Sequence, residues 1–125
     1  QARVDAALKP FGLTFARYEL LQLLSFTKTG ALPLGKLGTR LQVHPASVTN
    51  AVDRLETDGL VRRRQHPDDK RSTLAEITPA GRRLVERATM ALNREVFEDP
   101  GMGQGDAMAL VALLTDTRRR AGDFE

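Results

Sequence analysis

Apolar residues recur at helical spacing, every three to four positions, along the first part of the chain. The first helix is expected over 2–8 and ends before Lys9-Pro10, because proline disfavours helical backbone in the residue before it. A second helix is expected from Thr14, whose hydroxyl can cap it, to Gly30. Its broad apolar face predicts burial on more than one side.

Two short helices joined by a three-residue turn follow a short extended link. The first is predicted over 34–41 from the spacing of its leucines. The second begins at Pro45, which fits the first helical position because no helical hydrogen bond is lost there. Gly59 is suited to the left-handed conformation that ends helices. This pattern describes a helix-turn-helix, whose second helix inserts into the major groove of DNA.

The apolar period changes from about 3.6 to 2 after Gly59, which indicates strands. Residues 60–65 are predicted as one strand, 74–78 as its antiparallel partner and 66–71 as the connecting loop. A helix-turn-helix followed directly by such a hairpin is typical of a winged helix.

A long helix is expected to follow the hairpin. Thr78-Pro79 provides its cap and first-turn proline. The glycine-rich stretch 99–106 should break it, and a last helix is expected over 106–120. The 125 residues are enough for one domain. We therefore expect a mainly α-helical fold with a small β-hairpin.

The second helix of the predicted helix-turn-helix separates its side chains by type. Val48, Val52 and Leu55 point one way, whereas the opposite side carries small, hydroxyl, amide and cationic residues. The candidate DNA contacts on this helix are Ser47, Thr49, Asn50 and Arg54. An amide can pair with adenine, a hydroxyl with bases or phosphates, and a guanidinium with phosphate or guanine. An ordinary solvated helix face would have the same composition, so this helix alone leaves both interpretations open.

The predicted hairpin carries the positive charge of the chain. Its residues 62–71 include five basic and two acidic side chains, a net +3 that equals the formal charge of the whole chain. Arg62 and Arg64 alternate with Arg63 across the strand, so at most one set can face DNA, and Arg64 is a candidate phosphate contact. A basic hairpin on its own more often protects a sheet edge. Beside the helix described above, it favours nucleic-acid binding.

Three segments resemble the core of the MarR (multiple antibiotic resistance regulator) family of bacterial winged-helix regulators. They are "SVTNAVDRLETDGLV" at 47–61, "DKR" at 69–71 and "ITPAG" at 77–81. The stretch 12–24 is similar to the second helix of the family, so the resemblance covers most of the chain.

The resemblance implies a single MarR-like domain over 1–125 that forms a homodimer. Two winged-helix lobes, about residues 30–80 of each chain, would read a pseudo-palindromic operator in double-stranded DNA. Helices within 1–27 and 80–125 would form the dimer interface. The implied function is a transcriptional regulator, expected to be a repressor that a small-molecule effector releases from DNA.

Residue roles follow from the same resemblance. Asn50 would occupy the base-reading position, where many members of the family carry arginine instead. Arg71 would be the arginine that enters the minor groove. Asp69 would hold it through a charge-assisted pair, although aspartate also favours turns at such a position. Lys70, between them, is a further candidate contact.

The effector site is expected near the second helix, where four of the six aromatic residues fall within 11–26. Effectors such as aromatic carboxylates often bind in this family between that helix and the DNA-binding lobe. Phe15 and Tyr18 are the candidate pocket residues, with Tyr18 as the polar group. An aromatic stripe at helical spacing is more often plain core.

Several classes of protein do not fit the sequence. The absence of cysteine excludes disulfides and thiolate chemistry. His44 and His66 have no ligand-spaced partners, so no metal site or cofactor is expected, and no catalytic set is found. No apolar run approaches the roughly 20 residues that span a bilayer, and no leader pattern is present, which favours a cytoplasmic protein.

Two other functions remain open. A winged-helix module could bind an acidic protein through its basic hairpin without reading a DNA sequence. The chain could also be the dimerisation fragment of a larger enzyme whose catalytic residues lie elsewhere.

Overall fold

The computed structural model of the chain describes residues 2–95, and the statements below concern these residues. In chain order the elements are α1 (Ala2–Leu8), a 3₁₀ turn η1 (Lys9–Phe11), α2 (Phe15–Phe26), β1 (Ala31–Pro33), α3 (Leu34–Leu41), α4 (Pro45–Thr57), β2 (Val61–His66), β3 (Asp69–Ile77) and α5 (Pro79–Glu95). The predicted glycine-rich break over 99–106 and the last helix over 106–120 lie outside the described residues.

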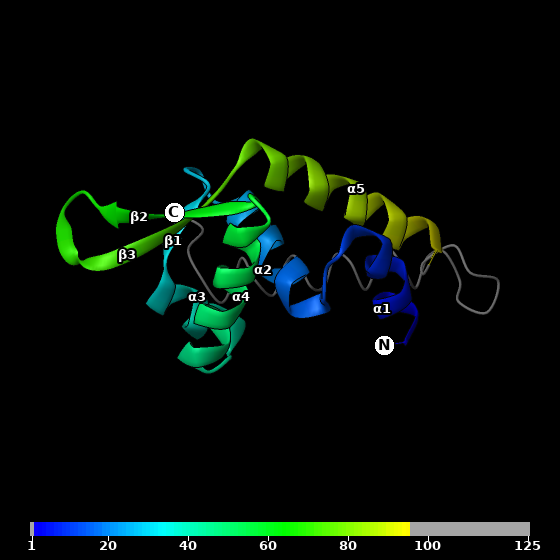
Figure 1. Ribbon diagram of the computed structural model, residues 1–125, viewed down its shortest axis with the longest axis horizontal. Coiled ribbons are helices and arrows are strands. Elements are labelled where there is room, and N and C mark those ends of the chain that lie inside the picture. The colour runs from blue at the N-terminus through cyan, green and yellow to red at the C-terminus, as the bar shows by residue number, and fades with distance from the viewer. Residues whose placement is uncertain (1, 96–125) are drawn as a thin grey trace.

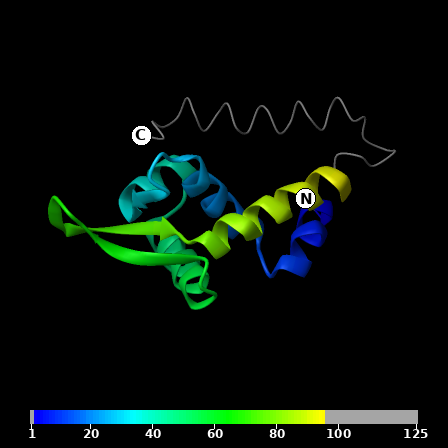
Figure 2. The same ribbon diagram turned by 90° about the horizontal axis from the view of Figure 1, so that it is seen from above.

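The structure is elongated, with the hairpin of β2 and β3 projecting at one end and α1 at the other (Figure 1). α5 runs from the sheet to α1, against which it packs (Figure 2). α2, α3 and α4 pack together and contact the sheet, and α2 also contacts α5. The most completely buried large side chains are Leu8, Leu20, Leu21, Leu23, Leu24, Leu37, Val52, Leu55 and Val61. The core thus joins the helix-turn-helix to α2.

The sheet has three antiparallel strands in the order β1-β3-β2. The prediction of a two-stranded hairpin therefore missed one strand of the sheet. Residues 31–33, read from the sequence as an extended link, pair with β3. Ala31 lies opposite Glu76, and the amide of Ile77 donates to the carbonyl of Gly30 at 2.8 Å. Three residues are too few to show the alternation by which a strand is recognised in a sequence.

The hairpin of β2 and β3, called the wing below, is longer than predicted, and its loop is shorter. β3 begins at Asp69 instead of Leu74, and only Pro67 and Asp68 separate it from β2. The tip candidates Asp69, Lys70 and Arg71 therefore lie at the start of a strand. Exposed residues fill this part of the hairpin on both faces, so no apolar alternation marks it.

α2 ends at Phe26 rather than at Gly30. The Thr27 hydroxyl and backbone amide both donate to the carbonyl of Leu24, at 2.8 and 3.1 Å, and close the helix end. Gly30, with a φ of 76°, instead lies in the turn that leads into β1.

Thr78 joins the end of the wing to α5. Its hydroxyl donates to the carbonyl of Gly59 at 2.7 Å and accepts from the amide of Gly81 at 3.0 Å, which confirms the predicted cap. Gly81 packs so closely on the carbonyl of Leu60 that a β-carbon at this position would overlap it. This contact fixes where α5 leaves the sheet.

Candidate nucleic-acid interface

α4 begins and ends as its sequence predicts. The Nδ1 atom of His44 accepts from the amide of Ala46 at 3.0 Å, so this histidine caps the helix that Pro45 starts. At the other end Gly59 has a φ of 74°. The helix buries Val48, Val52 and Leu55 against the domain. Its opposite side is consequently presented to solvent.

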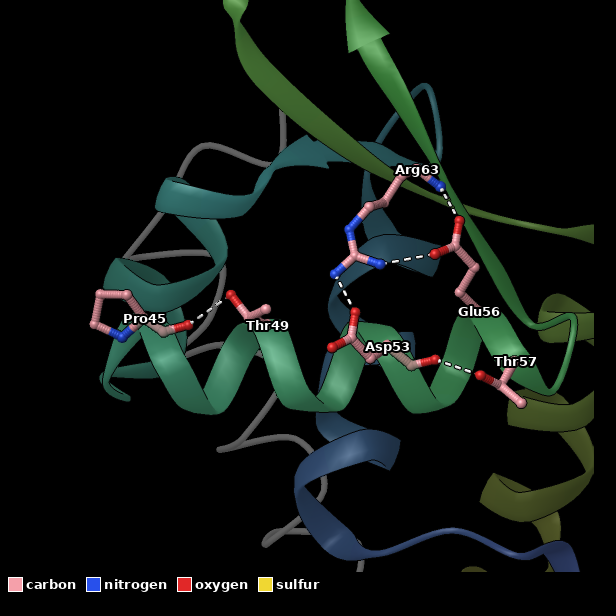
Figure 3. A network of polar contacts seen from close by, with 6 residues as sticks. All are labelled: Pro45, Thr49, Asp53, Glu56, Thr57 and Arg63. Carbon is pink, nitrogen blue, oxygen red and sulfur yellow. Dashed lines mark hydrogen bonds and ion pairs between the residues drawn. The ribbon is translucent and has the colours of Figure 1, made fainter.

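The four candidate contacts on α4 are all exposed: Ser47, Thr49, Asn50 and Arg54. Thr49 donates its hydroxyl hydrogen to the carbonyl of Pro45 at 3.1 Å, which leaves its oxygen as an acceptor (Figure 3). Within residues 2–95, neither Ser47 nor Asn50 has its side chain engaged by a partner. Their hydrogen-bonding groups are therefore available to a base or phosphate.

Arg54 is the cation on the flank of α4. Its Nε lies 3.1 Å from Oδ2 of Asp58, one helical turn later, in an exposed pair. The guanidinium of Arg54 also lines a cavity of about 480 Å³ between α4 and the start of α2. The other lining residues are Asp5, Lys9, Gly12, Leu13, Thr14 and Arg17.

This cavity has a cationic wall. Arg17 donates from Nη2 to the carbonyl of Gly12 at 3.1 Å, whereas its Nε is buried and has no hydrogen-bond partner within the described residues. Lys9 and Arg54 add two positive charges, while Asp5 lines the same cavity and Asp58 is paired with Arg54. Even with Asp58 counted, the side chains around the cavity carry a net charge of +1, which favours an anionic over a cationic ligand.

The three arginines of β2 divide between two faces of the strand, as its alternation predicts. Arg62 and Arg64 both reach Glu76, with Nε to Oε1 distances of 2.8 and 3.3 Å. The hydrogen bond from Arg62 holds the pKa of Glu76 below its ordinary value of 4.5. Arg63 turns instead toward α4. Arg64, a candidate phosphate contact, thus shares a carboxylate with Arg62.

The wing tip places its three candidates next to one another at the start of β3. Oδ1 of Asp69 accepts from the amide of Arg71 at 3.0 Å and lies 3.6 Å from its Nε. The side chain of Arg71 is 94% exposed and extends into solvent. Lys70 is exposed as well. Asp69 therefore accepts a hydrogen bond from the backbone of Arg71 and forms an ion pair with its guanidinium.

Arg71 also borders a second cavity, of about 550 Å³, between the wing and the first turn of α3. Lys36 lines the same cavity, and hydroxyl groups of Thr39, Ser72 and Thr73 surround it. Two cations, Arg71 from the wing and Lys36 from α3, thus line the same opening.

The predicted effector residues belong to the packing between helices. Tyr18 is 8% exposed, and its hydroxyl lies 2.7 Å from that of Thr89 on α5. Phe15 is partly buried, with its ring centroid 6.4 Å from that of Tyr18. Neither residue lines either of the two cavities described above. Their role in binding an effector stays a prediction.

The partners of Arg63 were not predicted from the sequence. Its guanidinium contacts Asp53 and Glu56 of α4, two residues that stand three apart and so share one side of the helix (Figure 3). That acidic spacing, together with the alternation along β2, is the signal that could have revealed the contact.

In the part of the chain that the structure describes, no three histidine, cysteine or acidic side chains are grouped so that they could hold a metal ion. None of the helices between residues 2 and 95 combines the length and apolar character needed to cross a bilayer.

Comparisons with known proteins identify the family. Residues 13–73 match the model of the MarR family. The regulator YdgJ of Bacillus subtilis, an uncharacterised HTH-type transcriptional regulator, is 35% identical over 115 residues, which cover 91% of this chain and 69% of that protein. Several other curated relatives are matched over about half of their length.

Two solved structures from Streptomyces coelicolor give the same result. Sco5413, a MarR family transcriptional regulator, is 49% identical, with a TM-score of 0.75 over 99% of this chain and 86% of that one. Sco3205, another MarR family regulator, was solved in complex with DNA. It is 25% identical, with a TM-score of 0.70 over 92% of this chain and 75% of that one. The fold, the helix-turn-helix with its wing and these likenesses together establish that the chain belongs to the MarR family.

Proposed function

We propose that the protein is a homodimeric, sequence-specific transcriptional regulator that binds double-stranded DNA. One observation carries the proposal: the exposed amide and hydroxyl side of α4 lies beside a wing that extends an almost fully exposed arginine, Arg71, into solvent. α4 would enter the major groove with Asn50 against base edges and Ser47 and Thr49 against bases or phosphates. Arg71 would enter the adjacent minor groove. Arg54, Arg64 and Lys70 would contact phosphates.

The DNA target is proposed to be a pseudo-palindromic operator. A twofold-symmetric dimer presents two copies of α4, which fit successive major grooves when they are about 34–36 Å apart. α1 and α5, which pack on each other at the end of the molecule opposite the wing, would supply part of the dimer interface. The 58% exposed side chain of Met90 on α5 supports this assignment, because a large apolar residue is stabilised by burial.

We further propose that the regulator is a repressor and that a small aromatic anion releases it from DNA. The cationic cavity between α2 and α4 supports this part of the proposal, because a ligand there would touch Arg54 on the DNA-reading helix itself. Release requires that the effector bind one spacing of the two α4 helices more tightly than the other. Phe15 and Tyr18 flank Arg17 in the sequence of α2, and we propose them as aromatic contacts of the effector although neither lines the cavity itself.

Such a regulator needs no catalytic residues, and we propose that the protein is not an enzyme and acts in the cytoplasm, where bacterial DNA is found. A protein-interaction module of the same fold would bind an acidic partner without selecting a DNA sequence. The two functions differ in sequence specificity, which can be measured directly.

Selection of bound duplexes from a random pool tests the proposal. We expect enrichment of one sequence with two inverted half-sites, bound at physiological salt at least about a thousandfold more tightly than a scrambled duplex. Affinity should fall steeply as salt rises, because counterions are released on binding. A pool that remains random after repeated selection would contradict sequence-specific regulation and favour the protein-interaction module.

A further inference from the structure

Arg63, the middle arginine of the wing, connects β2 to α4 through three bonds (Figure 3). Its Nη2 lies 2.6 Å from Oδ1 of Asp53, and its Nη1 lies 2.7 Å from Oε1 of Glu56. The backbone amide of Arg63 donates to the other oxygen of Glu56, at 3.0 Å. We refer to these three residues as the wing clamp.

The clamp follows from two periodicities. Asp53 and Glu56 are three residues apart on α4 and therefore lie on the same side of it. In β2, successive side chains point to opposite faces, so Arg63 faces α4 while its two arginine neighbours reach Glu76. The planar guanidinium, with donors on both sides, can bond the two carboxylates at once.

The backbone bond adds a constraint that an ion pair between side chains lacks. β2 lies at the edge of the described sheet, in the order β1-β3-β2. The backbone amide of Arg63, which belongs to this edge strand, donates its hydrogen bond to the carboxylate of Glu56 on α4. The strand backbone, not only a long flexible side chain, is thereby attached to the DNA-reading helix.

The net charge and the low exposure of Arg63 distinguish the wing clamp from a phosphate contact. One guanidinium and two carboxylates leave the clamp with a net charge of −1, so it does not attract a polyanion as a unit. The side chain of Arg63 is 27% exposed, compared with 94% for Arg71 at the tip. Two of its nitrogen atoms are already engaged within the protein.

We propose that Arg63 is a positioning residue that determines operator specificity without touching DNA. Through the wing clamp it holds the wing at a fixed angle to α4, so that one rigid unit reads a major groove and the adjacent minor groove together. Binding to non-specific DNA rests mainly on phosphate charge and does not require this angle. Reading both grooves does require it, because a loose wing would lose conformational entropy on binding. This inference rests on the proposed DNA-binding function.

The first test compares Arg63→Gln with Arg62→Gln, which removes the same charge from the opposite face of β2. We expect Arg63→Gln to weaken binding to the selected operator by about 5- to 10-fold, the size expected for losing a charge network, and to weaken binding to a scrambled duplex no more than Arg62→Gln does. Arg63→Lys should recover part of the loss, because an ammonium can reach one carboxylate but not both. Equal losses on both duplexes, with a shallower salt dependence, would make Arg63 a phosphate contact and overturn the proposal.

The second test removes the acidic partners and keeps the arginine. Without Asp53 and Glu56 a purely electrostatic model predicts tighter binding to any duplex, because two negative charges have gone. The proposal predicts that the double variant Asp53→Asn with Glu56→Gln binds the scrambled duplex more tightly and the operator more weakly. Tighter binding to both duplexes would show that the clamp only masks charge and would overturn the positioning role.

A third measurement is made without DNA and controls for folding. In Glu56→Gln the Arg63 amide should exchange its hydrogen faster, while the amides of the core helices retain their protection. A loss of protection throughout the core would mean that the variant is globally destabilised. If the loss of operator specificity then matched the loss of folded protein, the positioning role of Arg63 would be overturned. Failure of the wild type to select any operator overturns the proposed function itself. An operator that wild type and Arg63→Gln bind equally well overturns only the inference about Arg63.

Discussion

The hydroxyl oxygens of Tyr18 and Thr89 lie 2.7 Å apart and join α2 to α5. Thr89 also donates a hydrogen bond to the carbonyl of Val85 at 2.8 Å. A threonine hydroxyl has only one hydrogen, so Tyr18 is the donor and Thr89 the acceptor of the bond between them. Because Tyr18 is buried, the bond links α5, which packs on α1, to α2, which packs on α4 and β3.

Removing this bond should destabilise the protein. We expect Tyr18→Phe to lower the free energy of unfolding by about 1 kcal/mol, because the partly buried hydroxyl of Thr89 loses a partner. Thr89→Val should lower it by more, about 1–3 kcal/mol, since it leaves the tyrosine hydroxyl with an unmet hydrogen bond. Urea denaturation of both variants and of the double variant measures the coupling. Losses that simply add in the double variant would contradict a direct bond.

Arg71 is expected to contribute more to DNA binding than any arginine of β2 that is paired within the wing. Arg71→Ala should weaken operator binding by about 1–3 kcal/mol and reduce the salt dependence by about one counterion. Fluorescence anisotropy of a labelled operator at fixed salt, repeated at several salt concentrations, gives both quantities.

Arg62→Ala is the matched control, because it removes an equal charge that already lies 2.8 Å from Glu76. Its effect on operator affinity should be clearly smaller. An unchanged affinity in Arg71→Ala would exclude this residue from the interface, whatever the control shows.

The elements that pack on the core could be predicted from the sequence. α3 and α4 have the expected bounds because buried residues at helical spacing, a proline at the start of α4 and Gly59 after its end all agree. The missed parts are those that such patterns do not mark. β1 is too short to alternate, and the outer half of the wing has no core to contact.

The candidate site shows the same division. The burial of Val48, Val52 and Leu55 and the exposure of Asn50 follow from helical geometry. The partners of Arg63 do not, because they depend on the angle between β2 and α4, which tertiary packing sets. Helical geometry puts Asp53 on the outward side of α4 but gives no reason to expect an arginine beside it.

Gly81 should be intolerant of any side chain. In Gly81→Ala the new β-carbon would overlap the backbone carbonyl of Leu60 and press on the side chain of Ile77, so that α5 or the start of the wing must move. We expect a loss of about 1–3 kcal/mol in the free energy of unfolding, the usual range for overpacking. Urea denaturation measures it.

Gly35→Ala is the control for Gly81, because it adds the same methyl group in α3, where no atom lies within 4 Å of the new carbon. Replacing a helical glycine by alanine there should leave the protein as stable or slightly more stable. A similar loss in both variants would mean that the close contact at Leu60 does not explain the effect.

Glu76 should make stability depend on pH on the acid side. The hydrogen bond from Arg62, with the charges of Arg62 and Arg64, outweighs partial burial and holds the pKa of Glu76 below 4.5 in the folded protein. The unfolded chain therefore binds this proton more tightly, so the stabilisation is complete above the ordinary pKa and is lost as pH falls through the folded one. Urea midpoints measured between about pH 6 and 3 should decline less steeply in Glu76→Gln than in the wild type. The double variant Arg62→Gln with Arg64→Gln keeps the carboxylate, removes its partners and should flatten the same part of the curve. A decline parallel to that of the wild type in both variants would show that this ion pair does not contribute to folding.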